Sequence, residues 1–280
     1  MKTTVPRVVQ FIGYVSLFWC WLQLPSAASD LPAPLELENL TWTELRDRIA
    51  GGTTTILIPI GGTEQNGPAM ALGKHNVRVR FLAEKIAAQL GNALVAPVVA
   101  YVPEGRIDPP SGHMKFPGTI TITDKAFQTL LEQAARSFKH HGFKTIVLLG
   151  DHGGYQASEA AVAKRLNREW KDKPARVFAD LGFYRITQET YIEKLLNAGV
   201  NKSDIGVHAG LADTSLTLAI DPSMVRQERL RGGAKFGPVD GVYGGDPTRS
   251  SAALGQLGVD AIVEGTTTAI QAFVAKQKFR

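Results

Sequence analysis

The sequence predicts an α/β protein, a three-layer sandwich in which a mostly parallel β-sheet is flanked by helices. Short apolar, β-branched runs alternate along the chain with longer segments whose apolar residues recur at helical spacing. The composition agrees, because 280 residues with 44% hydrophobic and 20% charged content can bury a sizeable core. The same composition excludes a disordered chain, a collagen and a coiled coil.

The first half of the chain predicts two strands and two helices. A helix is expected to start at Thr41–Glu44, where threonine can cap it. The run Thr53–Ile60 is β-branched, apolar and bounded by glycines, and therefore predicts a buried strand. Apolar residues at helical spacing predict a helix over His75–Leu90. Ala93–Ala100 predicts a second strand, and Pro97 within it indicates an edge position or a bulge.

The second half of the chain continues the alternation. Strands are predicted at Lys144–Leu149 and Ala175–Asp180, and helices at 124–141, about 157–170, 188–198, 214–220 and 250–276. Ligands of such folds bind beyond the carboxyl ends of the strands. The loops that follow the strands are therefore the expected place for a site.

The first 28 residues predict a secretory signal peptide. Lys2 and Arg7 precede a 14-residue apolar run over 11–24, and small residues allow cleavage after Ala28. An uncleaved anchor is the alternative, but about 18–20 apolar residues are needed to cross a bilayer. We expect a single domain over 29–280 in the periplasm or outside the cell, with no membrane association after cleavage.

Charge and cysteine content narrow the function classes. The formal charge is +5, from 31 basic and 26 acidic residues, and loss of Lys2 and Arg7 leaves +3 (5 − 2). Cleavage also removes Cys20, the only cysteine, which excludes disulfides, a cysteine nucleophile and zinc–thiolate sites. No zinc finger, RNP motif or aromatic-interleaved basic run is present, so we expect no nucleic-acid partner.

Residues that can bind a metal follow the predicted strands. Glu64 follows the first strand, and His152 follows the strand at Lys144–Leu149, each within a glycine-rich loop. One carboxylate and neutral imidazoles form a ligand set that suits Zn²⁺ or a similar divalent ion. The separations from Glu64 to His75 and His152 match no compact metal motif. Ordinary loop residues that cap helices are therefore the alternative.

Five blocks of sequence resemble a known family. They are PIGGTEQNGP (59–68), SGHMKFPGT (111–119), GDHGG (150–154), HAGLADTS (208–215) and GVYGGDP (241–247). In this order they resemble the creatininase (creatinine amidohydrolase) family, from about Thr41 to the C-terminal helix. The resemblance implies an α/β amidohydrolase that opens cyclic or linear amide C–N bonds at a two-metal site, often with Zn²⁺ or Mn²⁺. It also implies a homo-oligomer, such as a hexamer.

The resemblance assigns roles to some residues and shows departures at others. Glu64 and His152 match ligands of the first metal, and His208 matches the histidine that handles protons near the substrate. The family's bridging aspartate falls on His75, and its histidine after Glu-Gln falls on Asn66. Its second-metal glutamate falls on Gly154, its Glu-Thr-Ser is Asp213-Thr214-Ser215, and its Asn-Gly before the histidine is Gly150-Asp151.

These departures predict one metal ion rather than two. A neutral imidazole at His75 cannot bridge two cations, and the amide of Asn66 is a poor ligand compared with an imidazole. Glu64, His75 and His152 are therefore the predicted ligands of a single ion, with zinc expected first and manganese or iron as alternatives.

The same resemblance suggests how the reaction proceeds. Asp213 or Asp151 is the candidate acceptor of the water's proton, and His208 the candidate donor to the departing nitrogen. A helix start after His208 disfavours the imidazolium and lowers its pKa. His113, Asp151 and Asn66 are candidate substrate-binding residues.

Two functions of different class follow from the sequence. One is a secreted or periplasmic metal-dependent amidohydrolase acting on a small amide. The other is a non-catalytic small-molecule-binding protein of the same fold that has lost one or both metals.

Overall fold

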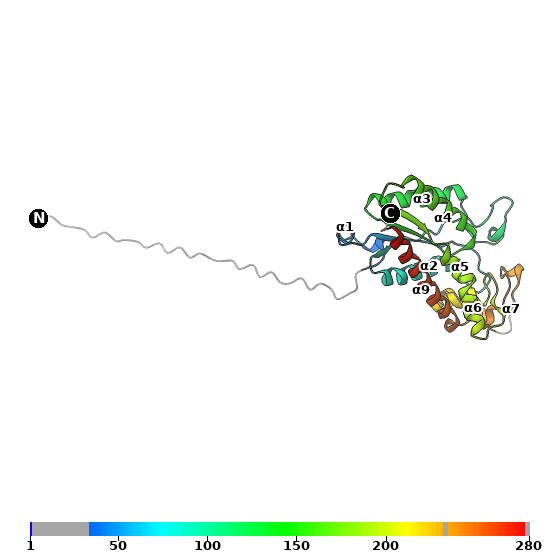
Figure 1. Ribbon diagram of the computed structural model, residues 1–280. Helices are drawn as coiled ribbons and strands as arrows, with labels where there is room; N and C mark the ends of the chain where they lie inside the picture. Colours follow the sequence, from blue (N-terminus) through cyan, green and yellow to red (C-terminus); the bar gives the residue numbers. More distant parts are fainter. Residues whose placement is uncertain (2–33, 232–234, 278–280) are drawn as a thin grey trace. The chain divides into compact units, whose positions relative to one another are not determined.

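Four parallel strands form the sheet, in the order β2-β1-β3-β4. They are β1 (Thr55–Ile60), β2 (Ala93–Val95), β3 (Thr145–Gly150) and β4 (Arg176–Ala179). The computed structural model describes Met1 and residues 34–231 and 235–277 (Figure 1). The predicted signal peptide lies outside these ranges.

Helices cover both faces of this sheet, as predicted (Figure 1). Residues of β1 and β3 alternate between the two faces: Ile56 and Ile146 pack with α3 (Asp124–His140) and α4 (Gln156–Glu169). Leu57 and Val147 pack on the opposite face. The helices of that second face are α2 (Lys74–Leu90), α5 (Leu181–Gln188), α6 (Thr190–Asn197), α8 (Leu211–Ile220) and α9 (Ala252–Gln277).

Local signals explain where several elements begin and end. The first helix, α1 (Trp42–Ala50), has Thr41 as its cap, in a capping box with Glu44. Strand β2 lies at the sheet edge as expected, but it ends at Val95, two residues before Pro97. The helix predicted over 188–198 is wrong in extent. Two helices, α5 and α6, occupy 181–197 and are separated at Glu189, whose ψ of −81° departs from helical geometry.

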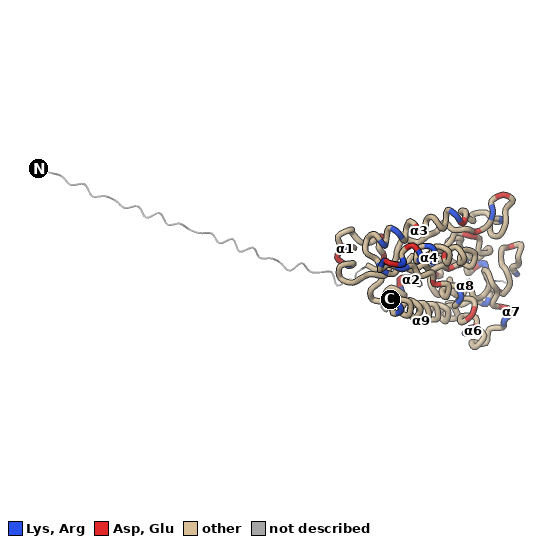
Figure 2. Tube along the Cα trace, turned by 45° about the horizontal axis from the view of Figure 1, so that its top comes forward, with Lys and Arg blue, Asp and Glu red and all other residues tan. Residues whose placement is uncertain are grey.

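The surface carries both signs of charge. Basic and acidic residues are interspersed over the outer helices in the view of Figure 2. The short helix α7 (Lys202–Ile205) lies near the loop that leads into α8. Among the described residues no helix combines the length and apolarity needed to span a bilayer.

Candidate active site

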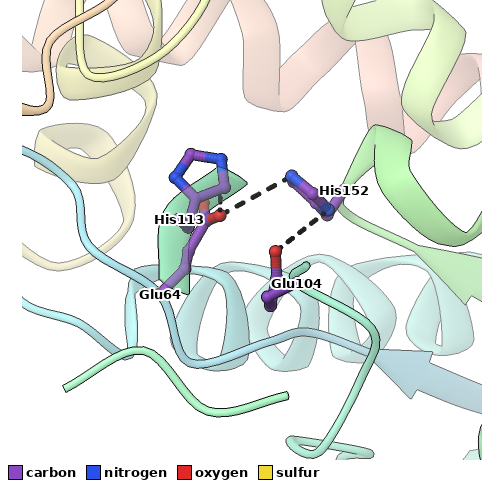
Figure 3. A group of neighbouring side chains, drawn as sticks. All are labelled: Glu64, Glu104, His113 and His152. Atoms are coloured by element: carbon purple, nitrogen blue, oxygen red, sulfur yellow. Dashed lines mark ion pairs between the residues drawn. The ribbon is translucent and has the colours of Figure 1, made fainter. Parts of the chain in front are cut away.

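The loops after three strands bring four possible metal ligands together. Glu64 follows β1, His152 follows β3, and Glu104 and His113 lie in the long segment after β2. One ligand atom from each lies within 4.8 Å of the other three (Figure 3). This group, hereafter the carboxylate–histidine cluster, forms where parallel strands end, as the fold predicts.

The contacts within the cluster centre on Glu64. Its Oε2 lies 3.2 Å from Nε2 of His113 and 3.6 Å from Nε2 of His152. Nδ1 of His152 lies 3.7 Å from Oε2 of Glu104. Glu104 reaches the cluster past Gly62, whose φ is +145°; a Cβ there would lie 2.7 Å from Oε1 of Glu104. Glycine at position 62 therefore gives this carboxylate its space.

Several acceptor oxygens of the cluster have no hydrogen-bond partner. Oε2 of Glu64 and both carboxylate oxygens of Glu104 are buried without a hydrogen-bond partner. Burial, with a smaller contribution from the charge of Glu64, raises the pKa of Glu104 to about 9. Burial lowers the pKa of His152 to about 4, so its imidazole is neutral at pH 7. Two close carboxylates beside neutral imidazoles are the donor set that Zn²⁺ or Mn²⁺ prefers, and the residues fit such an ion.

A second group lies beside this cluster and is built from ion pairs. Lys74 and Arg78, on the first turns of α2, both contact Asp213. Arg78 also donates to Oδ2 of Asp151, at 2.7 Å from Nη2 and 3.0 Å from Nε. The two arginine contacts hold the pKa of Asp151 below its ordinary value despite its burial. We call Lys74, Arg78, Asp151 and Asp213 the ion-pair group.

His75 connects the two groups. Its Nε2 lies 2.8 Å from Oε1 of Glu64, and its Nδ1 lies 2.6 Å from Oδ2 of Asp151. Both ring nitrogens therefore face carboxylate oxygens. Burial raises the pKa of Glu64, but His75 and Lys74 outweigh it and hold that pKa well below its ordinary value. The role of His75 as a metal ligand stays a prediction.

His208 lies at the edge of the cluster, next to Gln65. Its Nε2 is 3.0 Å from the carbonyl oxygen of Gln65, and its Nδ1 is 3.7 Å from Oε1 of Glu64. Burial lowers the pKa of His208 to about 3, and the charge of Lys74 adds to this. The predicted direction of this shift is confirmed, but its main cause is burial rather than the helix start. The ring is therefore neutral at pH 7 and is a weak base.

Other predicted residues lie in varied surroundings. Asn66 donates to the backbone oxygens of Glu64, at 2.9 Å, and Ala71, at 3.0 Å, and so braces its own loop. Asp213 accepts from the backbone N–H of Ala209, and the cations Lys74 and Arg78 outweigh burial to hold its pKa well below the ordinary range. A carboxylate so stabilised is a weak base.

Three residues of the site were missed by the sequence reasoning. Glu104 follows no strand directly and carried no signal. Lys74 and Arg78 carried one, because helical spacing places both on the buried face of α2 with Val79 and Leu82. A buried lysine and arginine on an apolar face require acidic partners, which a scan of that face would have indicated.

A cavity of about 240 Å³ opens onto both groups. Its walls include Tyr184, Gln188 and Tyr191 from α5 and α6, and Val207 from the loop before α8. Its polar lining includes His75, His113, His152 and His208 together with Asp151 and Asp213. Pockets for drug-sized ligands have about 300–1,000 Å³, so this one suits a small molecule.

A parallel α/β sheet with carboxylates and imidazoles at its carboxyl edge defines the general class of a metal-dependent hydrolase. The model of the creatininase (creatinine amidohydrolase) family matches residues 38–270. The chain belongs to the creatininase family, as its sequence motifs predicted.

Relatives and solved structures agree with this assignment. Creatinine amidohydrolase of Pseudomonas putida is 26% identical, over 83% of this chain and 95% of its own length. A mycofactocin precursor peptide peptidase of Mycolicibacterium smegmatis is 28% identical, over 77% of this chain and 84% of its own. A 3-dehydro-scyllo-inosose hydrolase of Thermotoga maritima is 27% identical over 70% of this chain, but the match spans 60% of that relative.

The solved structures support the fold and the class of enzyme. The crystal structure of a creatinine amidohydrolase has a TM-score of 0.68 and 25% identity, covering 85% of this chain and 97% of its own. A manganese creatininase has the same TM-score and 24% identity, covering 85% and 98% of the two chains. The predictions of a creatininase fold and of an amidohydrolase are confirmed at the level of the family.

Proposed function

We propose that this protein is a secreted or periplasmic amidohydrolase that uses one divalent metal ion to cleave a C–N bond of a small cyclic or linear amide. One observation carries the proposal. Two buried carboxylates with unpartnered oxygens, those of Glu64 and Glu104, meet the imidazoles of His113 and His152, which line a small cavity. Such an excess of acceptors is costly unless a cation is bound.

The carboxylate–histidine cluster would hold the ion through Glu64, Glu104, His113 and His152. Zinc or manganese fits this mixed oxygen and nitrogen set, and both metals occur in solved creatininases. When bound, such an ion polarises a carbonyl and lowers the pKa of water from 15.7 to about 7. His75 is assigned to orienting Glu64, because both its nitrogens already contact carboxylates.

The protein's own residues would handle the proton and the substrate. We assign proton donation to the departing nitrogen to His208, because a pKa of about 3 makes its imidazolium a strong proton donor and its neutral ring a weak acceptor. Asp213 and Asp151 are held by the cations Lys74 and Arg78, which supports a positioning role for both carboxylates.

The relatives do not indicate one common substrate for this protein. The names of three relatives indicate creatinine, an inosose derivative and a precursor peptide as different substrates. The cavity of about 240 Å³ favours a small amide or lactam over a folded peptide. We propose a homo-oligomer, since the sequence resemblance implies one.

Metal content tests this proposal directly. The chain, expressed in full and purified without chelator, should hold about one ion by plasma mass spectrometry and hydrolyse members of a lactam and formamide panel. His152→Ala should lose the ion and the activity. His140→Ala, at the end of α3 and far from the cluster, is the matched control and should keep both. A wild-type protein that binds no zinc or manganese when offered would overturn the enzyme and leave a small-molecule-binding role.

The predicted compartment needs its own experiment. N-terminal sequencing of the protein recovered from a periplasmic or culture fraction should begin at Ser29. An intact N-terminus beginning at Met1 in a cytoplasmic fraction would contradict secretion.

A further inference from the structure

Two basic side chains are buried beneath the candidate active site. Lys74 is 1% exposed and Arg78 is 4% exposed, both on the first turns of α2. Lysine and arginine are rarely buried to this degree unless they are paired. Their partners are the carboxylates that line the cavity floor, so the pair belongs to the site and not to the hydrophobic core.

The contacts of these cations reach both groups of the site. Nζ of Lys74 contacts Asp213 and lies 4.0 Å from Oε1 of Glu64. Arg78 contacts Asp213 and Asp151. Each fixed positive charge therefore lies between carboxylates, which is where a metal ion would otherwise lie.

The charges at the site determine how many ions it can take. Glu64, Glu104, Asp151 and Asp213 carry −4 when all four are ionised, and Lys74 and Arg78 carry +2. The remaining −2 (−4 + 2) equals the charge of one divalent ion. A second divalent ion would leave an excess positive charge in a buried site.

We propose that Lys74 and Arg78 are resident cations that take the place of a second metal ion, so that the site works with a single ion. This inference rests on the proposed metal-dependent function. Lys74 and Arg78 are thus positioning residues: they hold Asp213 and Asp151 in place and limit the metal count. The replacement also accounts for Gly154, where a Cβ would lie 2.9 Å from the His152 ring and no further ligand fits without a shift.

Removing one resident charge tests the proposal through metal binding. Lys74→Met should raise the zinc or manganese content from about one ion per chain towards two, or tighten the first ion at least tenfold, because a nearby positive charge is lost. Metal content is read by plasma mass spectrometry and affinity by titration in chelator-buffered metal. A purely structural lysine predicts the opposite, a weaker ion and a lower melting temperature.

Three further variants control for side effects of the substitution. Lys74→Arg keeps the charge and should keep one ion. Lys85→Met lies on the exposed part of the same helix and should match wild type. Lys74→Met combined with Asp213→Asn removes one charge of each sign, and should return the protein to one ion with near wild-type affinity.

The outcomes separate this inference from the proposed function. A wild-type protein without any ion overturns the proposed function. One ion in the wild type together with an unchanged or weaker ion in Lys74→Met overturns only the role of Lys74 and Arg78 as resident cations. Two ions in the wild type overturn that role and the one-ion count of the proposed function, and leave metal-dependent hydrolysis standing. Should Lys74→Met not fold, Arg78→Gln carries the same test, since Asp151 keeps its contact with His75.

Discussion

The candidate active site has two halves, the carboxylate–histidine cluster and the ion-pair group, which differ in how their buried charges are paired. In the carboxylate–histidine cluster, Glu64 and Glu104 keep oxygens without partners. In the ion-pair group, Lys74 and Arg78 pair with Asp151 and Asp213. The first half therefore has oxygens suited to a cation from solution, whereas the second half carries its own cations.

The pKa values follow this difference. Burial and the charge of Glu64 raise the pKa of Glu104 to about 9, because the opposing effect of Lys74 is too small to offset them. The pKa values of Asp151 and Asp213 lie below their ordinary values beside Arg78 and Lys74. Burial alone therefore does not mark a metal ligand; burial without a paired cation does.

The largest expected effect comes from Glu64, which belongs to the cluster and also lies 4.0 Å from Lys74 of the ion-pair group. Glu64→Gln removes the charge that faces His113 and His152 on one side and His75 on the other. We expect loss of the ion and a fall of kcat/KM by about 10³-fold or more, of the size that a missing electrostatic partner produces. Glu38→Gln, on the exposed 3-10 helix near the N-terminus, is the control. Full activity in Glu64→Gln would contradict the site.

A smaller effect on metal binding is expected at Glu104. This effect tests whether Glu104 or His75 is the metal ligand. Glu104→Gln keeps the size of the side chain but weakens a ligand, so the metal Kd should rise by about 10–100-fold. His75→Gln should change it less if His75 only orients Glu64. If His75→Gln lost more metal affinity than Glu104→Gln, the ligand set predicted from sequence, Glu64, His75 and His152, would be favoured again.

The contrast between the halves also explains what the sequence could predict. The alternation of apolar periods placed all four strands and most helices, because burial on a two-faced sheet leaves a strong signal. Glu64 and His152 follow strands directly, and the fold rule was sufficient to find them. The boundary between α5 and α6 depends on one backbone angle at Glu189 and left no such signal.

The roles of Glu104 and of the resident cations Lys74 and Arg78 could be recognised only in the three-dimensional structure. Glu104 lies in the segment 96–123, whose only regular element among the described residues is a short 3-10 helix at Gly112–Lys115. No periodicity indicates where such a segment folds back. Lys74 and Arg78 were visible on the inner face of α2, but their partners come from distant loops.

The number of protons released on metal binding gives a further test of Glu104 as a metal ligand. In the metal-free protein the raised pKa of Glu104, about 9, keeps this carboxyl protonated at pH 7, whereas a metal ligand must be deprotonated. His152, with a pKa of about 4, has no proton to lose. Binding at pH 7 should therefore release up to about one proton from Glu104. As pH rises past about 9 this release should disappear, because Glu104 is then already ionised.

Calorimetry in buffers of different ionisation enthalpy measures this release. Glu104→Gln, titrated with the same metal, should show it reduced by about one proton. Equal proton release in both proteins would mean that the proton comes from another group, and would weaken the assignment of Glu104 to the ion.

The smallest effect on metal binding is expected at Tyr155, which joins the strand ends behind the cluster. Its hydroxyl is buried, lies 2.7 Å from the carbonyl oxygen of Gly61 and accepts from the N–H of His152 at 3.1 Å. Tyr155→Phe leaves these groups unpaired, which costs about 1–3 kcal/mol of unfolding free energy. Because no ligand charge changes, the metal Kd should shift by less than tenfold.

Tyr155→Phe and Glu104→Gln should therefore have opposite effects on stability and on metal affinity. This opposition is the sharpest test of the difference between framework residues and metal ligands. The tyrosine variant loses stability and keeps its ion. The glutamine variant loses affinity for the ion, yet in the metal-free state at pH 7 it should be at least as stable as wild type, because folding no longer has to protonate a buried carboxyl. Urea unfolding of both proteins, with Tyr101→Phe on the exposed surface as control, measures the difference. If metal-free Glu104→Gln were clearly less stable than wild type, Glu104 would belong to the structural framework, and the unpartnered oxygens would not mark an ion.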